Sequence, residues 1–270
     1  MNSLNVLYED NHIIVVVKPI NILSQKDSTN DSDMLSIIKD YLKEKYHKPG
    51  NVYLGLVHRL DRVVGGVMVF AKTSKAASRL SNDIRENKFH KTYLAICHGK
   101  TKESDTLKDF IKKESDFKSV ITTKEEGKLA ILDYQLIDYN QEKDLSLVKV
   151  NLQTGRHHQI RCQFKNMNHP LVGDKRYGND NYNNIGLFAY SLTFIHPVKK
   201  EEMTFTYLPS HFPFNLFNIK EENDLCQYFT NDELEKTAKE LVYIEEYPDE
   251  YKSYNNRKKL KDALLSDDIL

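Results

Sequence analysis

The sequence predicts a fold in which β-strands are mixed with α-helices. The β-branched run Ile13 to Val17 indicates a strand, and Lys18-Pro19 ends it because proline cannot donate to a strand ladder. Apolar residues alternate within Asp144 to Leu152, which indicates a second buried strand. Between the two, apolar residues recur at helical spacing at Met34, Ile37, Ile38, Tyr41 and Leu42. Two periodicities in one chain favour a mixed fold.

Composition allows a sizeable core and suggests a polyanionic partner. The chain has 270 residues, enough for one large domain or two small ones, with 40% hydrophobic residues. Its 39 basic and 39 acidic residues are unevenly spread. Residues 221–270 hold 7 basic and 14 acidic residues, a net of −7, which leaves 32 and 25, a net of +7, in residues 1–220. A basic body with an acidic tail favours a partner such as nucleic acid.

The cysteines and the first apolar run suggest a cytoplasmic protein. Cys97, Cys162 and Cys226 are far apart, without metal-ligand spacing, so we expect free thiols in a reducing compartment. The five-residue run from Ile13 to Val17 is too short for a signal peptide or a membrane span. We therefore expect a cytoplasmic protein with no membrane segment and no bound metal.

The first half of the chain alternates strands and helices. Val6-Leu7-Tyr8 and a polar turn precede the first buried strand. Ser32 or Asp33 can cap one helix, and Thr73 or Ser74 another. Phe89 to Ile96 is predicted to be a strand. The charged segment 100–130 is predicted to be an insertion or a hairpin.

A helix is predicted to begin near Arg156, after the turn Gln153-Thr154-Gly155. Ile160, Phe164 and Met167 share one face of it, which we expect to be core. A second face carries His158, Arg161 and Lys165 and is predicted to be basic. The adjacent His157 and His158 point about 100° apart on a helix, so they do not make a zinc pair.

The chain is predicted to divide into a domain of residues 1–217 and an acidic, helical extension of residues 218–270. The capping box Thr230-Asn231-Asp232-Glu233 and the apolar positions that follow indicate a helix in the extension. Either its charge competes with phosphate for the basic body, or its apolar face packs on that body.

The most informative segment runs from Leu56 to Lys72. Within it Asp61 lies between Arg59 and Arg62, and a glycine pair leads into an apolar strand. Spacing alone leaves two interpretations open. The three charges form a surface ion pair, or the carboxylate faces a cleft and the arginines grip phosphate.

His58-Arg59-Leu60-Asp61-Arg62 resembles the signature of the RluA-type RNA pseudouridine synthases. Lys91 to Ala95 and Thr154 to Arg161 resemble the second and third motifs of this family, and Pro170 to Gly178 with Leu187 to Pro197 resemble its later loop and strands. The blocks occur in the family's order across residues 4–215. The resemblance starts close to Met1, so we expect no small RNA-binding domain ahead of it.

The resemblance implies roles for individual residues. Asp61 is the essential catalytic residue, Arg161 pairs with it, and Tyr93 stacks on the target uracil and takes part in proton transfer. Ile160 lies against the base, and Arg59 fills the space that the flipped nucleotide leaves. The remaining motif residues expected to contact RNA are His58, Arg62 and Arg156.

Three positions depart from the family pattern. The usual Thr-Ser is replaced by Val64-Gly65, which removes two hydroxyl groups, and Phe188 stands where the family usually has histidine. An inactive RNA-binding relative is therefore one alternative to an active enzyme. A hydrolase with an aspartate nucleophile is another, and it would need a metal or a second acid near Asp61.

The resemblance implies isomerisation of uridine to pseudouridine within rRNA or tRNA, by a monomer that needs no cofactor. It also implies the pseudouridine synthase fold, an α+β fold with a long, mixed, mainly antiparallel sheet, flanking helices and a central basic cleft.

Overall fold

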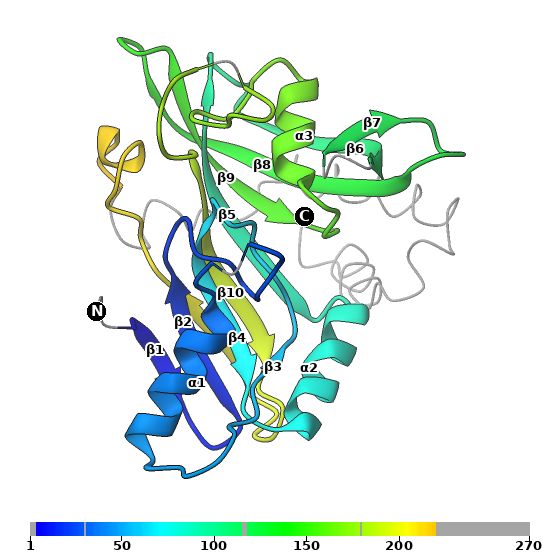
Figure 1. Cartoon of the computed structure of the whole chain (residues 1–270). Helices are drawn as coiled ribbons and strands as arrows, with labels where there is room; N and C mark the ends of the chain where they lie inside the picture. Colours follow the sequence, from blue (N-terminus) through cyan, green and yellow to red (C-terminus); the bar gives the residue numbers. More distant parts are fainter. Residues whose placement is uncertain (1–3, 30, 115–117, 179, 220–270) are drawn as a thin grey trace, which may run out of the picture.

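The strands of the described residues form one mixed sheet (Figure 1). The structure is a computed structural model that describes residues 4–29, 31–114, 118–178 and 180–219. Its elements in chain order are β1 (Val6–Glu9), β2 (Ile13–Lys18), α1 (Met34–Lys45), β3 (Gly55–Leu56), β4 (Gly65–Ala71), α2 (Ser74–Arg85), β5 (Phe89–His98), β6 (Ser104–Lys113), β7 (Ser119–Thr122), β8 (Lys128–Asn140), β9 (Leu145–Leu152), α3 (Gln159–Asn166), β10 (Leu187–Ile195), β11 (Glu202–Thr206) and a 3-10 turn (Phe214–Leu216).

The sheet is long and mainly antiparallel. Its strand order is β1-β2-β4-β10-β5-β9-β8-β6-β7, with β3 paired to β4 and β11 paired to β10. Among the described strands, β4 and β10 make the one parallel pair. The predicted α+β fold with a mixed, mainly antiparallel sheet is therefore confirmed.

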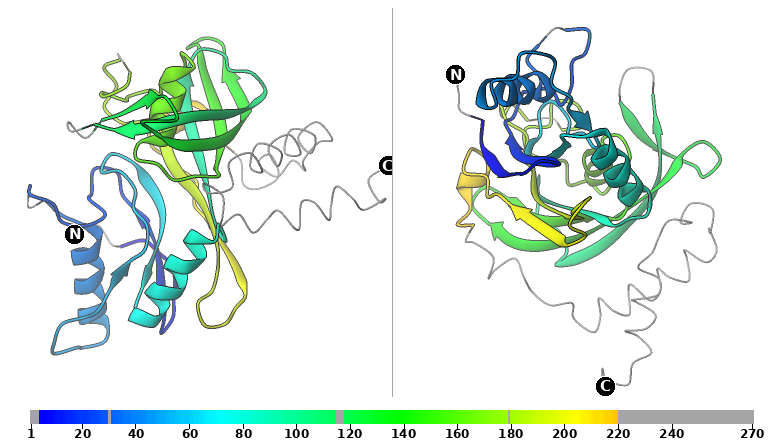
Figure 2. Two further views of the ribbon diagram at one scale, coloured as in Figure 1. Left: turned by 90° about the vertical axis from the view of Figure 1, so that its right-hand side faces the viewer. Right: turned by 90° about the horizontal axis from the view of Figure 1, so that it is seen from below.

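The helices α1 and α2 cover opposite faces of β2 and β4. Ile14 and Val16 pack in one cluster with the buried side of α1, whereas Ile13 and Val15 pack in another with α2. Successive residues of a strand point to opposite faces, so both faces of β2 are covered and its side chains can all be apolar (Figure 2). Asp33 and Thr73 cap the two helices through their side chains, as predicted.

A close backbone approach joins β4 to β10. Gly66 has a φ of +134°, and a Cβ at this position would lie 2.3 Å from the carbonyl oxygen of Ala189. Only glycine fits such a conformation at such a distance. The parallel contact brings the segment before β4 to the middle of the sheet.

The second half of the sheet carries α3 and a hairpin arm, which consists of β6, β7 and the start of β8. The charged segment 100–130 forms β6, β7 and the start of β8, which confirms the predicted hairpin. On α3, Ile160 and Phe164 belong to the main core, while Cys162 packs with Ile111 and Tyr177. The helix therefore lies between the core and the arm.

Residues 220–270, and with them the predicted helical extension, lie outside the described residues. In the part of the chain that the structure describes, the helices are too short and too polar to cross a membrane.

Candidate active site

The loop that carries Asp61 runs between β3 and β4 and is held at two points. The Ser24 hydroxyl donates to the carbonyl of Leu60 at 2.8 Å and accepts the N–H of the same residue at 3.1 Å. The Lys18 ammonium donates to the carbonyl of Arg62 at 3.1 Å and to that of Pro19 at 2.9 Å. The residues on both sides of Asp61 are thus fixed to β2 and the segment after it.

Lys18 is fully buried. Burial lowers the pKa of its ammonium to about 7, against the opposing effect of the Asp61 charge. The ammonium group that holds the Asp61 loop therefore titrates near neutral pH.

Arg161 bridges two carboxylates. Its Nη1 donates to Asp61 Oδ2 at 2.9 Å, while Nε and Nη2 donate to the two oxygens of Asp174, each at 2.8 Å. Burial opposes the charge of Arg161, but the hydrogen bonds and charges of Asp174 and Asp61 outweigh it and raise the pKa of Arg161. The bidentate pair with Asp174 orients the guanidinium and leaves one edge for Asp61.

The prediction of a basic face on α3 is wrong for Arg161 and His158. Arg161 is only 6% exposed and turns inward to Asp61 and Asp174. His158 precedes α3 in a left-handed conformation, with Nε2 3.4 Å from Asp61 Oδ2. Of the three predicted residues, only Lys165 is exposed. The helix begins at Gln159 rather than near Arg156, and its residues from Gln159 to Phe164 are buried.

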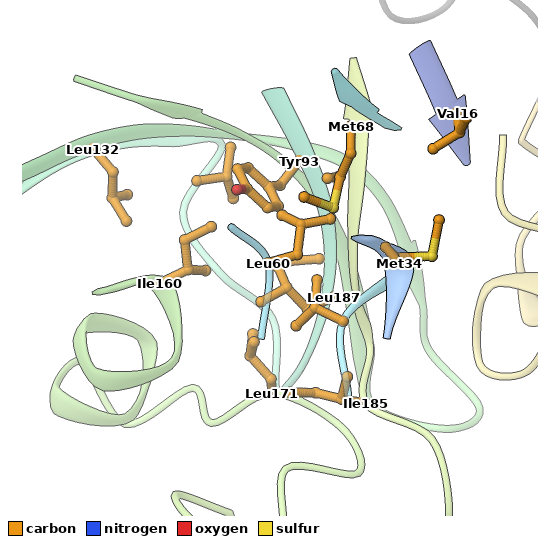
Figure 3. Close-up of a cluster of buried hydrophobic side chains, with 14 of the residues drawn as sticks. Val16, Met34, Leu60, Met68, Tyr93, Leu132, Ile160, Leu171, Ile185 and Leu187 are labelled. Atoms are coloured by element: carbon orange, nitrogen blue, oxygen red, sulfur yellow. The ribbon is translucent and has the colours of Figure 1, made fainter. Parts of the chain in front are cut away.

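A cavity opens beside Asp61, and its wall combines charged and apolar groups. The lining residues include Arg59, Asp61, Val64, Lys91, Tyr93, Arg156, His158, Ile160, Arg161 and Leu187. Tyr93 and Ile160 are buried in the same core cluster as Leu60 and Leu187, which Figure 3 shows around them. Burial, with a contribution from the Asp61 charge, raises the pKa of the Tyr93 hydroxyl. Tyr93 is therefore a neutral phenol at the edge of the apolar core.

The other predicted residues differ in their surroundings. Arg59 is exposed and lines the cavity. Arg156 also lines it, and its Nε donates to the carbonyl of Leu129 at 2.7 Å. Arg62 is exposed, forms an ion pair with Asp31 at 2.7 Å and is not a lining residue.

His58 is buried away from the cavity. Its Nε2 accepts the N–H of Val69 at 3.1 Å, and its ring lies against Phe89 with 5.1 Å between centroids. Burial, with the nearby Lys91 charge, lowers its pKa well below the usual value. These surroundings give the imidazole a packing function.

The sequence does not indicate the surroundings of two further residues at the site, Asp174 and Lys91. Nothing in the spacing of Asp174, in the segment Pro170 to Gly178, indicates that it faces Arg161. Lys91 is two residues from Tyr93 on β5, so both side chains point to the same face. Burial lowers the pKa of Lys91 to about 8. The alternation within β5 was a signal that could have identified Lys91.

The site offers donors and acceptors rather than ligands for a metal. Among the described residues, no three His, Cys, Asp or Glu side chains gather as a metal site would require. The two imidazoles of His157 and His158 stack on each other, with 3.8 Å between centroids. The groups that meet here are one accessible carboxylate, a fixed guanidinium, a neutral phenol and an apolar wall.

The chain is similar in sequence to known proteins. The family model described as RNA pseudouridylate synthase matches residues 12–166. The chain is 31% identical over 215 residues to an uncharacterized RNA pseudouridine synthase of Aquifex aeolicus, covering 75% of this chain and 68% of that protein. It is 29% identical over 219 residues to the ribosomal large subunit pseudouridine synthase D of Haemophilus influenzae, covering 74% and 65%.

Solved structures show the same fold. Human RNA pseudouridylate synthase domain containing 4 superposes with a TM-score of 0.65 at 21% identity, covering 78% of this chain and 91% of that one. Human RNA pseudouridylate synthase domain containing 1 superposes with a TM-score of 0.63 at 22% identity, covering 78% of this chain and 85% of that one. Relative to the bacterial proteins, the chain spans about two thirds of their length.

Proposed function

The chain belongs to the RNA pseudouridylate synthase family, as its resemblance to the RluA-type enzymes predicted, and we propose that it converts uridine to pseudouridine within RNA, with Asp61 as the essential catalytic residue. The observation that carries this proposal is the contact of Asp61 with Arg161 at the wall of a cavity that Tyr93 and Ile160 also line.

The reaction is an isomerisation, so every atom of the substrate remains in the product. The bond from ribose C1′ to uracil N1 breaks, the base turns in the cavity, and a bond from C1′ to C5 forms. The proton displaced from C5 passes to solvent while N1 takes one up. The reaction needs a carboxylate that attacks the sugar or the base, or that takes a proton from the sugar. It needs no redox partner and no cofactor.

The residues around Asp61 have complementary roles in this proposal. Arg161 orients the carboxylate, because Asp174 fixes the other edge of the guanidinium. Tyr93 and Ile160 hold the uracil between a phenol ring and an aliphatic side chain, and the neutral Tyr93 hydroxyl takes part in proton transfer. Arg59, exposed at the cavity, fills the space of the extruded nucleotide, whose unstacking costs a few kcal/mol.

The substrate we propose is ribosomal RNA. Named relatives act on the large ribosomal subunit by their descriptions, and a net charge of +7 in residues 1–220 suits a phosphate backbone.

Residues 1–217 are the proposed catalytic domain, with a basic cleft at the cavity, and residues 218–270 its extension. We propose a cytoplasmic monomer. The described cysteines, Cys97 and Cys162, are free thiols, in keeping with a reducing compartment.

The alternatives find less support. Asp174, the acid that shares Arg161 with Asp61, is 2% exposed with both oxygens bound to Arg161, so it cannot serve the hydrolase mechanism. Val64 is buried and leaves the contact of Asp61 with Arg161 intact, so the missing hydroxyl groups do not favour an inactive relative.

Mapping of pseudouridines in total RNA tests the proposal. Cells with and without this gene should differ at one or a few uridines of ribosomal RNA. Identical maps would contradict the proposed activity. A difference confined to tRNA would contradict the proposed substrate.

A further inference from the structure

His158 has no role in the mechanism above, although it lies next to the proposed catalytic carboxylate. Its Nε2 is 3.4 Å from Asp61 Oδ2, and its Nδ1 is 3.0 Å from the Tyr177 hydroxyl. Its backbone φ is 54°, in the left-handed region that residues with a side chain rarely adopt. Such conformations persist where the surrounding structure over-determines them. The imidazole is therefore held at Nδ1, with Nε2 beside the Asp61 carboxylate.

The hydrogen bonds of Tyr177 favour one tautomer of this imidazole. The backbone N–H of Ser119 donates to the Tyr177 hydroxyl oxygen at 2.7 Å. Tyr177 then has its own proton to donate, and the neighbouring acceptor is Nδ1 of His158. A neutral imidazole that accepts at Nδ1 carries its proton on Nε2. The nitrogen that carries this proton lies 3.4 Å from Asp61 Oδ2.

The neutral state follows from the groups that face the ring. They are Asp61, Arg161, the stacked His157 and Arg176, together with Tyr177. Burial lowers the pKa of His158 to about 4. The charges of Arg161, His157 and Arg176 also lower it, whereas the charge of Asp61 acts in the opposite direction. Burial also raises the pKa of Tyr177, so the phenol keeps the proton that it donates.

The two groups that contact Asp61 approach the same oxygen. Arg161 Nη1 and His158 Nε2 both face Oδ2. In the part of the chain that the structure describes, Oδ1 has no hydrogen-bond or ion-pair partner. One oxygen of the carboxylate is therefore anchored and the other is left for the cavity.

We propose that His158 is a positioning residue for Asp61. As the Nε2–H tautomer set by Tyr177 and the Ser119 N–H, it fixes Oδ2 and presents Oδ1 to the substrate. The contact of 3.4 Å shortens when RNA fills the cavity, as contacts in unliganded active sites commonly do. The arrangement also links β7 of the hairpin arm, through Tyr177 and His158, to Asp61. The catalytic consequence rests on the proposed function, whereas the tautomer does not.

Nitrogen-15 NMR of the full chain labelled at histidine tests the tautomer without any substrate. The chain has 10 histidines, and the His158 signals are assigned by their loss in His158→Gln. We expect a neutral Nε2–H ring at neutral pH, and a changed tautomer ratio in Tyr177→Phe. A charged ring, a Nδ1–H ring, or an unchanged ratio in Tyr177→Phe would overturn the proposal.

Kinetics test the positioning role. His158→Leu, which removes the donor, should lower kcat by about 10- to 100-fold with little change in KM. His158→Gln should recover part of this loss, because its amide N–H can reach Asp61. Tyr177→Phe should lower kcat less, and the matched control Tyr134→Phe, on β8 and outside the cavity lining, should not change it.

Melting temperatures of all variants show that the comparison is made on folded protein. Equal kcat losses in His158→Leu and His158→Gln, or none in His158→Leu, would overturn the positioning role. A wild-type protein without activity, but with the expected tautomer, would instead contradict the proposed function alone.

Discussion

Asp61 and Arg161 are 100 positions apart in the sequence, and Asp61 Oδ2 lies 2.9 Å from Arg161 Nη1. The first residue sits on a loop held by Ser24 and Lys18, the second on a buried helix oriented by Asp174. The fold brings the loop and the helix together at one cavity.

Arg161→Met should lower both turnover and stability. It leaves Asp174 buried without its cation, and loss of one partner of a buried pair costs about 3–5 kcal/mol. Urea unfolding measures this loss, and turnover on RNA is measured below the unfolding transition. As a control, Arg62→Met removes an exposed pair with Asp31 and should cost no more than about 1 kcal/mol. Equal costs for the two variants would show that burial does not strengthen the Arg161 contacts.

Tyr93→Phe should separate stacking from proton transfer. The ring and its packing remain while the hydroxyl is lost, so the melting temperature should stay close to that of the wild type. If the hydroxyl transfers a proton, turnover should fall by about 100-fold or more. Wild-type turnover in a folded Tyr93→Phe protein would leave the residue a stacking role only.

Gly65 and Phe188, two of the three departures from the family pattern, lie against each other. A Cβ at position 65 would be 3.0 Å from Phe188 Cε2. Gly65→Ser should therefore destabilise the protein by about 1–3 kcal/mol through overpacking, whereas Gly50→Ser, where a Cβ meets nothing within 4 Å, should not.

The same substitution in a Phe188→His background should cost less, because the ring that meets the new side chain is smaller. The coupling in such a double-mutant cycle should be about 0.5–3 kcal/mol. Additive free energies of unfolding would mean that the two departures are independent.

The buried Lys18 should make stability depend on pH. Its folded pKa of about 7 lies below its unfolded value of 10.5, so between these values the unfolded chain binds more protons. Stability should then rise with pH across this window, by up to about 1.4 kcal/mol per pH unit. Below pH 7 both states are protonated and this contribution is constant.

Urea unfolding across this window measures the slope. Lys18→Met should reduce it, while Lys75→Met, at an exposed position on α2, should leave it unchanged. A Lys18→Met protein with the wild-type slope would contradict the depressed pKa.

Local patterns predicted the strands, the helix caps and the hairpin arm, because each depends on neighbouring residues. The motif blocks predicted that Asp61, Tyr93, Ile160 and Arg161 share one site, and the structure gathers them around one cavity. The direction of Arg161 could not be predicted from helical spacing. It depends on Asp174, which comes from a later loop, and a charged helical residue without a known partner is expected to face solvent.

The partners of Asp61 show the same limit. Spacing left open a local ion pair with Arg59 and Arg62, but Arg62 pairs with Asp31. The contact of Asp61 with Arg161, 100 positions away, was implied by the family resemblance and not by spacing. The surroundings of His58 and His158 likewise depend on strands and loops distant in the sequence. Tertiary packing, rather than spacing, decides which charged residue contacts Asp61.

Asp61 is the residue that we propose carries out the isomerisation. The most direct measurement is pseudouridine formed per enzyme molecule in ribosomal RNA from cells that lack the gene, for the wild type and for Asp61→Asn. Asp61→Asn keeps the size of the side chain, and it should fold and bind this RNA as the wild type does but form no pseudouridine. Pseudouridine formation by Asp61→Asn at the wild-type rate would contradict the assignment.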